Sequence, residues 1–409
     1  MGTELPALSR RSLLLGASAL GCLIPFSTAR SLPAQSTSTD ADELQSLFDG
    51  ATAGSTIRIP PREHVLEGYI LLPQAPDVTI IAAGATFTGG SARFYSGGHS
   101  GLTWRGGRFA GDGTKALCFA FLGSTDYVFE HIEFDQVQPF GWHLFDLIGC
   151  TNFTFKALDV CGYGNTTDLS ATSVYSLYKE AIQLDYAYTG ASGGAGLNDL
   201  LEAAGGTFDG SASTDITVEH STFAAARDDD GIVSWAPCPM GQHAYSPDEQ
   251  NARIRFVRNV VSDAIPLNSL SGGAWPRGAL SFVPIVDLEV TGNRFEATVP
   301  AAQRENWIQI VSNSDGRLPD PSTMLPSSGI AVTDNRFGGF APTRAYVRLE
   351  SDMDHPNYRI SDVIVSGNHS ACGESSPTWV ERIGIDSQFS DIVVSDNKAM
   401  SSCPEPSDA

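Results

Sequence analysis

Basic side chains are scarce in this sequence. Lys and Arg number 25 against 47 Asp and Glu among 409 residues, which gives a formal net charge of −22 at pH 7. Nucleic-acid binding needs clustered Lys and Arg to neutralise phosphates, so this composition argues against nucleic acid as a partner. Hydrophobic residues make up 42% of the chain, which argues against disorder.

Long apolar runs are absent beyond the first 35 residues, so no later segment could span a bilayer. The N-terminal segment has Arg10 and Arg11 before an apolar run that reaches Ile24. This pattern is typical of a twin-arginine export signal. We therefore expect residues 1–35 to be removed and residues 36–409 to form a secreted protein that is not held in a membrane.

Cysteines at zinc-ligand spacing are also missing, so we expect no metal centre of that kind. Removal of the signal leaves six cysteines. In an exported protein this even number permits disulfides, and the local pairs are Cys150 with Cys161 and Cys372 with Cys403. The alternative is that these cysteines are free thiols buried in the core.

Instead of helical segments, the sequence contains a short recurring phrase. An alternating apolar strand is followed by a small polar turn and then by Phe or a similar residue. The phrase begins near Tyr127, Phe153, Ile216, Ile254, Leu288, Ile330, Val363 and Ile392. Most intervals are about 25–40 residues, which is the range of solenoid repeats.

Further short strands are predicted between these phrases. The candidates are residues 116–122, 143–148, 181–186, 231–235, 264–270, 307–312, 345–350 and 379–385. No coil has the 10–15-residue helix that a βαβ repeat needs. The sequence therefore predicts an all-β chain, a single right-handed parallel β-helix. In such a solenoid each coil packs only on its neighbours, so one core can extend over the whole chain.

The N-terminal region agrees with this fold. Residues 40–50 read as a short helix that would cap the first coil, with Leu44 and Phe48 on one face. The strand at 57–59 and the stretch 78–87, which ends in Gly-Ala-Thr-Phe, form the first coil. Here the sequence resembles the pectin-lyase-like β-helix superfamily over about residues 40–400. The resemblance implies the fold and a carbohydrate substrate or ligand.

Strand alternation indicates which side chains point outward. With Ile182 and Leu184 in the core, Gln183 and Asp185 face outward, as does Asp146 in the preceding coil. In later coils the matching outward residues are expected to be Asn268, Gln309, Arg348 and Arg382. Stacked at about 4.8 Å, these residues and Trp235 would suit a chain of sugar hydroxyls. The alternative is an ordinary solvated sheet face.

Three insertions interrupt the repeat beside this row. They cover residues 162–179, 187–213 and 236–250. Long excursions from one face of a solenoid tend to build its binding site. We therefore expect the site in the middle of the solenoid.

An acidic turn stands out in the same region. Asp228, Asp229 and Asp230 follow Arg227, and Glu180 holds the matching place one coil earlier. Glycoside hydrolysis needs two carboxyl groups flanking the scissile bond, and crowding raises the pKa of one of them. This sequence therefore suggests Glu180 or Asp185 as the base that activates water, with Asp229 or Asp230 as the acid. The alternative is an acidic turn or a cation site.

The acidic residues also resemble those of polygalacturonases in the same superfamily. On that resemblance Glu180 matches the first carboxylate and Asp229 and Asp230 match the pair. The sequence departs from the family because Glu180 replaces an Asp and residues 262–264 replace the expected Gly-His-Gly turn. The family's Arg-Ile-Lys motif is missing.

His243 and Tyr245 complete the candidate residues. The motifs around Glu180 and His243 are similar to those of a group of exported bacterial β-helix proteins. A His with a pKa near neutral could act as acid, base or sugar ligand. The alternative for His243 is a structural loop position, and His143 is expected to serve in packing.

Three functions compete at this stage. The first is an exported glycoside hydrolase that acts on a polysaccharide and needs no cofactor. Asp146, Gln183, Arg227, Trp235, Tyr245 and Asn268 would bind the sugar. The second is a polysaccharide lyase or uronate epimerase with Lys179, His243 or Tyr245 as base and Arg227 or Ca²⁺ on the uronate. The third is a non-catalytic carbohydrate-binding surface protein.

Overall fold

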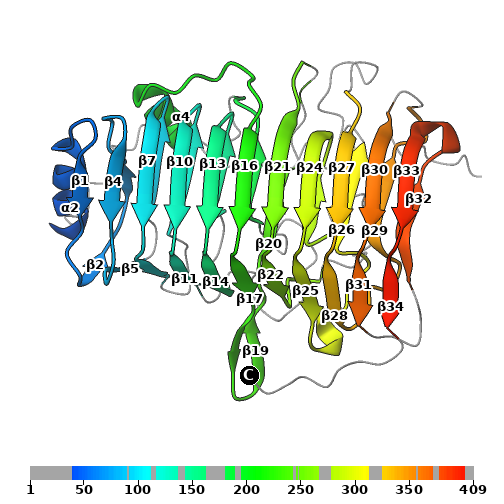
Figure 1. Cartoon of the computed structure of the whole chain (residues 1–409). Coiled ribbons are helices and arrows are strands. Elements are labelled where there is room, and N and C mark those ends of the chain that lie inside the picture. The colour runs from blue at the N-terminus through cyan, green and yellow to red at the C-terminus, as the bar shows by residue number, and fades with distance from the viewer. Residues whose placement is uncertain are drawn as a thin grey trace, which may run out of the picture.

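The computed structural model describes residues 39–89, 92–111, 117–136, 143–162, 180–188, 195–242, 246, 248–266, 278–312, 325–355, 358–371 and 377–400. In this part of the chain, three long parallel sheets stack coil upon coil into a right-handed β-helix (Figure 1). The predicted fold is confirmed. The export signal lies outside the described residues, as do Lys179, Cys372 and Cys403.

Each coil contributes one strand to each sheet. Sheet A, the face nearest the viewer in Figure 1, has eleven strands in the described residues. They are β1 (Thr56–Arg58), β4 (Val78–Ile81), β7 (Ser100–Arg105), β10 (Thr125–Glu130), β13 (Thr151–Lys156), β16 (Thr214–Glu219), β21 (Asn251–Val257), β24 (Ile285–Thr291), β27 (Ser328–Thr333), β30 (Ile360–Ser366) and β33 (Phe389–Ser395). The eight recurring phrases all begin in sheet A, as their apolar alternation predicts.

Sheet B follows sheet A after a sharp corner in every coil. Its strands are β2 (Glu63–Val65), β5 (Thr86–Thr88), β8 (Arg108–Ala110), β11 (Glu133–Gln136), β14 (Asp159–Gly162), β17 (Thr222–Ala224), β22 (Val260–Ser262), β25 (Arg294–Ala297), β28 (Arg336–Gly339), β31 (His369–Ala371) and β34 (Lys398–Met400). The Phe that ends the recurring phrase lies here, as Phe134 and Phe295 do, and points into the core.

Sheet C closes the coil and carries the candidate site. Its strands are β3 (Tyr69–Leu71), β6 (Arg93–Gly97), β9 (Cys118–Leu122), β12 (Phe145–Ile148), β15 (Glu180–Asp185), β20 (Cys238–Gly241), β23 (Leu280–Phe282), β26 (Ile308–Ser312), β29 (Ala345–Ser351) and β32 (Thr378–Ile383). Six of the eight strands predicted between the phrases are confirmed here. Residues Gly231–Ser234 form a strand as predicted, but in a hairpin instead of sheet C, where β20 takes its place. The strand predicted at 264–270 lies mostly outside the described residues.

The described elements outside the three sheets are few. A two-stranded hairpin joins β18 (Ala226–Asp228) to β19 (Gly231–Ser234). The helices are α2 (Thr39–Asp49) and α4 (Ala195–Ala203), and single 3-10 turns occur at Pro300–Ala302 and Asp386–Gln388. No helix in the described part of the chain is long and apolar enough to cross a membrane.

The core changes character along the solenoid. In the first coils aromatic rings stack between neighbouring coils: the Phe119 ring lies 5.0 Å from the Phe94 ring and 5.0 Å from the Phe145 ring. In the same sheet C rank, later coils place Ile308 and Val347, both fully buried.

In the later coils, asparagine residues occupy the corner between sheets A and B. The stacked residues are Asn259, Asn293, Asn335, Asn368 and Asn397. Asn293 N–H donates to Asn335 Oδ1 at 2.9 Å, and Asn335 Nδ2 donates to the Val290 carbonyl at 2.9 Å. This asparagine ladder satisfies buried backbone groups that the turn would otherwise leave without partners. The same corner in the earlier coils holds Ile132 and Leu158, which are buried apolar residues.

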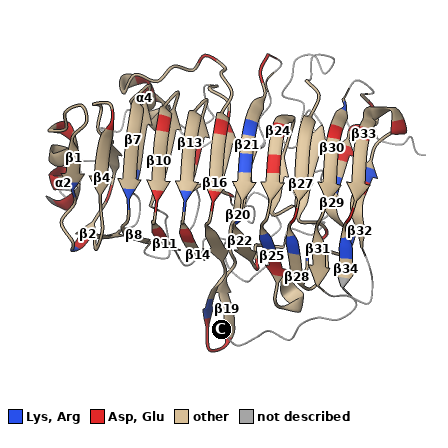
Figure 2. Cartoon of the chain, in the orientation of Figure 1, with Lys and Arg blue, Asp and Glu red and all other residues tan. Residues whose placement is uncertain are grey.

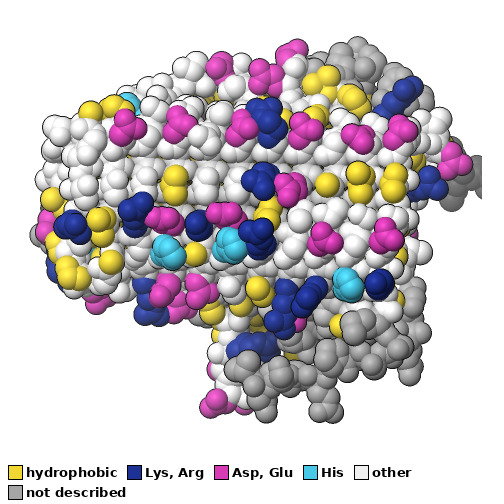
Figure 3. Space-filling model, viewed as in Figure 1, with side chains coloured by type: hydrophobic (Ala, Val, Ile, Leu, Met, Phe, Trp, Pro, Cys, Tyr) yellow, Lys and Arg dark blue, Asp and Glu magenta, His cyan; other side chains and the backbone are white. Residues whose placement is uncertain are grey.

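One row of residues has the same backbone conformation in most coils. At or near the beginning of the sheet A strands lie Asp77, Asp126, Asn152, Asp215, Arg253, Asp287, Asp362 and Asp391, with φ between 53° and 60°. Gly54, Gly101 and Gly329 fill the row in the remaining coils at φ 71°, 78° and 68°. Asp and Asn tolerate this left-handed region better than most residues. Acidic side chains therefore run along this face of the solenoid (Figure 3).

Helix α2 covers the first coil, which confirms the predicted cap (Figure 1). Its Leu44 and Phe48 are buried against the core. Asp40 Oδ2 accepts from Val65 N–H at 2.8 Å, and the Gln45 Oε1 accepts from Leu71 N–H at 2.9 Å. The cap thus covers apolar core and also pairs edge groups that sheets B and C would otherwise expose.

The predicted local disulfide between Cys150 and Cys161 is wrong. Both residues are free thiols, as are Cys118 and Cys238. The Cys150 thiol is buried and contacts the Ile148 carbonyl at 3.6 Å, whereas Cys161 lies in sheet B beside Asp135. Cys150 lies between β12 and β13, at the corner between sheets C and A, so the two cysteines occupy different parts of the coil. Burial raises the pKa of the Cys150 thiol to about 12.

Candidate functional site

The outward row predicted on sheet C exists. Strand register aligns Asp146 with Gln183, and the rank continues through Gly241, Ser281, Gln309, Arg348 and Glu381. The prediction is confirmed for Gln309 and Arg348. It is wrong for Arg382, which pairs with Leu349 in the next rank. A slip of one residue moves a side chain to the other face of a strand.

Most residues of this row are not exposed to solvent, however. Gln183, Gln309 and Arg348 are 2%, 0% and 3% exposed. In the N-terminal part of the same face, α4 packs on Leu122 and Ile148 through Leu197 and Leu201 and forms a small second core. The insertion at 187–213 therefore builds a cover over sheet C. The expectation of an accessible groove lined by this row is wrong for these residues.

A polar cluster lies where the α4 cover meets the polar part of the row. Its members are His143, Asp146, Glu180, Gln183 and Asp185, on β12, β15 and the residues just before them. His143 Nδ1 lies 3.3 Å from Glu180 Oε2. Gln183 Nε2 donates to Asp185 Oδ2 at 2.5 Å. Four residues expected in the site are thus brought together, and His143 joins them.

The cluster is closed on most sides. Glu180 is fully buried and Asp185 is 3% exposed, whereas Asp146 is partly exposed and the His143 side chain is 22% exposed. Side chains alternate along β15, so Glu180 points to the same side as Ile182 and Leu184. Asp185 points to the opposite side. These two carboxylates therefore do not face one common space, as the hydrolase hypothesis requires.

Burial and charge perturb the titration of the cluster. Burial raises the pKa of Asp146 to about 7; Asp185 and Glu180 add to the rise, while His143 and Arg93 oppose it. For His143, burial lowers the pKa, but the hydrogen bond and charge of Glu180 outweigh burial and the net pKa is raised. Asp146 thus has a carboxyl group that changes its charge near neutral pH.

In the part of the chain that the structure describes, two buried acceptors of the cluster lack a hydrogen-bond partner. Asp146 Oδ1 and Gln183 Oε1 are buried and have no hydrogen-bond partner among the described residues. They belong to directly paired residues on neighbouring strands. Unmet buried acceptors are costly, and a donor from a bound molecule would satisfy them.

The acidic turn lies elsewhere. Asp229 and Asp230 are exposed at the tip of the β18–β19 hairpin, which projects from the solenoid (Figures 1 and 2). The strand paired with β15 is β20, so the expected juxtaposition of Glu180 with Asp229 and Asp230 is wrong. The misleading signal was the apolar alternation of residues 231–235, which forms part of a hairpin.

The remaining predicted binding residues of this coil have structural contacts. Arg227 forms an ion pair with buried Asp263 and donates to Thr298 Oγ1 at 2.7 Å, which fixes the base of the hairpin. Trp235 is 2% exposed and packs in the hydrophobic core, so it offers no ring face to a sugar. His243, Tyr245 and Asn268 lie outside the described residues.

His143 is expected from the sequence to serve in packing, and Arg93 is not among the candidate residues. His143 lies two residues before Phe145, and Glu180 lies two residues before Ile182, to which Phe145 is paired. Comparing Glu180 with the preceding coil instead of the following one would have found this contact. Arg93 is 8% exposed on β6 and acts on Asp146 through its charge. No local motif marks it.

Among the described residues no group of three or more His, Cys, Asp and Glu side chains is arranged to hold a metal ion.

Comparisons with known proteins give a fold but no family. No family model matches the chain, and no curated protein matches it. Two solved structures of PfbA, described as a surface adhesin of Streptococcus pneumoniae, are similar to it. One has a TM-score of 0.60 at 15% identity and covers 88% of this chain and 83% of its own. The other has a TM-score of 0.50 at 13% identity, with 88% and 95% covered. At this identity the likeness supports the parallel β-helix alone, and membership of the pectin-lyase-like superfamily remains a resemblance.

Proposed function

We propose that this chain is an exported, non-catalytic carbohydrate-binding protein. The observation that carries the proposal is the separation of the candidate catalytic carboxylates. Glu180 is sealed on the inward rank, Asp185 is buried on the other side of β15, and Asp229 and Asp230 lie on a distant hairpin. Hydrolysis needs two carboxyl groups on either side of one bond.

The polar cluster supplies the recognition chemistry. Asp146 is partly exposed, and its Oδ1 and the neighbouring Gln183 Oε1 are acceptors without partners among the described residues. Paired residues on adjacent strands lie about 4.8 Å apart, a spacing that suits two neighbouring hydroxyl donors on one sugar ring. The likeness to PfbA, a surface adhesin of Streptococcus pneumoniae, is in keeping with a binding role outside the cell.

The test is a binding screen of the purified chain against plant, algal and microbial polysaccharides, with product analysis on every hit. We expect binding without release of reducing ends. Asp146→Ala and Gln183→Ala should each weaken binding about tenfold or more, since each removes an acceptor. Asp159→Ala, an exposed carboxylate on sheet B, is the matched control and should bind normally. Equal binding by all three variants would refute this site.

Hydrolysis is the second candidate, because a carboxyl group with a pKa of about 7 suits a general acid. In this function Asp146 would donate the proton and Asp185 would activate water. New reducing ends that disappear in Asp146→Asn would select hydrolysis over binding alone. Absorbance of an unsaturated uronide in the products would instead select a lyase.

A further inference from the structure

The two ends of the solenoid are finished differently. At the N-terminal end α2 covers the core and pairs edge groups of β2 and β3. At the opposite end the last strands of the three sheets in the described residues are β32, β33 and β34. A strand edge of this kind presents rows of backbone donors and acceptors to any chain that can pair with it.

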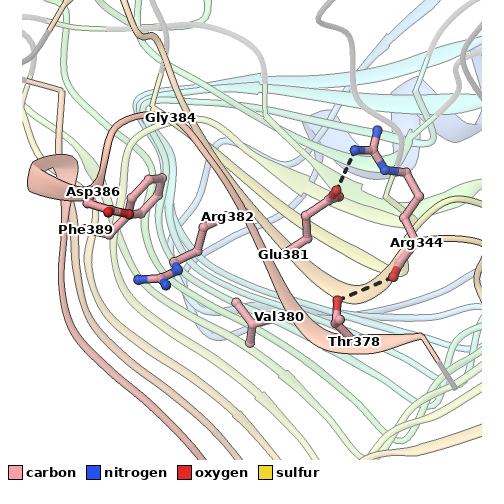
Figure 4. Close-up of a pocket in the computed structure, with 8 residues that line it drawn as sticks. All are labelled: Arg344, Thr378, Val380, Glu381, Arg382, Gly384, Asp386 and Phe389. Atoms are coloured by element: carbon pink, nitrogen blue, oxygen red, sulfur yellow. Dashed lines mark hydrogen bonds and ion pairs between the residues drawn. The ribbon is translucent and has the colours of Figure 1, made fainter.

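Core positions come to the surface at that end. Val365 is fully buried, but Val394, its partner in the last coil, is 46% exposed. Val347 is fully buried and its partner Val380 is only partly buried. The end face contains a depression of about 510 Å³, lined by Arg344, Thr378, Val380, Glu381, Arg382, Gly384, Asp386 and Phe389 (Figure 4). We call this surface the C-terminal end face.

The end face carries two opposite charges. Arg344 pairs with Glu381. Arg382 and Asp386 have no ion pair among the described residues, and both line the depression, where Asp386 lies beside Phe389 (Figure 4). Arg382 occupies the inward rank that Leu349 fills one coil earlier. A charge at a core position is expected only where the last coil faces something other than another apolar coil.

We infer that the C-terminal end face binds the same face of a second copy and forms a two-fold, end-to-end dimer. A two-fold contact is self-complementary, because each residue pair occurs twice. Arg382 then faces Asp386 of the partner subunit, and the exposed valines meet their equivalents. The outer edges of β32, β33 and β34 of both copies come together as well. This inference is independent of the proposed carbohydrate site.

The test measures the dimer dissociation constant of the purified chain by analytical ultracentrifugation. Arg382→Asp and Asp386→Arg each place like charges opposite one another at both contacts, so each should raise the dissociation constant by about tenfold or more. An equimolar mixture of these two variants should form a heterodimer, because both contacts again join opposite charges. The double variant Arg382→Asp/Asp386→Arg should dimerise like the original chain.

Controls separate this contact from other forms of association. Arg58→Asp reverses an exposed charge on β1 at the other end and should leave the dissociation constant unchanged. Val394→Lys should weaken the dimer while circular dichroism shows an intact fold. A monomer at all concentrations would overturn the inference. So would a dimer that ignores the Arg382 and Asp386 reversals, or a contact that Arg58→Asp disrupts.

Discussion

The first coils and the later coils follow the same backbone path but are held together differently. Up to β14 the core is a stack of aromatic rings, and the outer face of sheet C is apolar beneath α4. From β21 onward the asparagine ladder runs along one corner, and the sheet C row contains Gln309 and Arg348 with Glu350. A parallel β-helix therefore fixes the direction in which each side chain points, but it does not fix which type of residue occupies each rank. The polar cluster of Asp146 and Gln183 lies at the boundary between the two regimes.

The largest effect is expected in the aromatic half. Phe119→Ala removes a fully buried ring that stacks between Phe94 and Phe145. Such a cavity should lower the free energy of unfolding by about 3–5 kcal/mol. Urea denaturation measures it, with Val128→Ala on the outer face as a control that should cost well under half as much. A loss near that of the control would mean that the stack contributes little.

The asparagine half should respond to the loss of hydrogen bonds. Asn335→Ala leaves Asn293 N–H and the Val290 carbonyl without their side-chain partners. Because these buried polar groups are left unpaired, the free energy of unfolding should fall by about 2–4 kcal/mol. Thr333→Ala, which removes a partly buried hydroxyl two residues before Asn335, should lower the free energy of unfolding by about 0.5 kcal/mol. Equal losses for the two variants would contradict the role of the ladder.

The α4 cover should behave as a local unit. Leu201→Ala empties a fully buried position between α4 and sheet C and should destabilise the helix by about 2–3 kcal/mol. Because the main core does not depend on this contact, hydrogen exchange should accelerate in residues 195–203 and not in β10 or β13. Acceleration throughout the first coils would mean that the cover and the solenoid unfold together.

The smallest effect concerns the boundary between the halves and depends on pH. The pKa of Asp146 is raised from 3.8 to about 7, so the native state binds this proton more tightly than the unfolded chain does. Its stabilising contribution is complete below about pH 4 and is lost as the pH rises through 7. Asp146→Asn cannot ionise and should therefore gain a few degrees in Tm relative to the original chain at pH 8 but not at pH 4. Thermal melts of both proteins, with Asp159→Asn as the exposed control, measure this difference. A constant gap in Tm across pH would show that Asp146 does not titrate in this range.

Much of the fold could be predicted because the solenoid repeats its local rules. Apolar alternation located every strand of sheet A from β10 to β33. It failed at β20, whose sequence Cys-Pro-Met-Gly contains the two residues least typical of strands, while the hairpin strand Gly231–Ser234 looked more regular. Pattern alone could not reveal that residues 226–234 leave the coil.

The site was predicted in part for the same reason. Alternation correctly placed Gln183 on the outward rank, but exposure depends on what covers that rank. Leu197 and Leu201 reach sheet C strands that precede them by about fifty residues or more, and no local pattern encodes such a contact. The partnership of His143 with Glu180 likewise depends on the register between coils.

The residues with left-handed backbone conformation at the start of the sheet A strands could help to recognise distant relatives of this protein. What each coil demands there is a backbone shape, so Asp, Asn and Gly can replace one another freely while β-branched residues are barred. The overall sequence identity to a distant relative could then fall to that of unrelated chains while the Asp, Asn and Gly residues of this row are kept. The spacing of these residues along another sequence would then locate each coil of its solenoid.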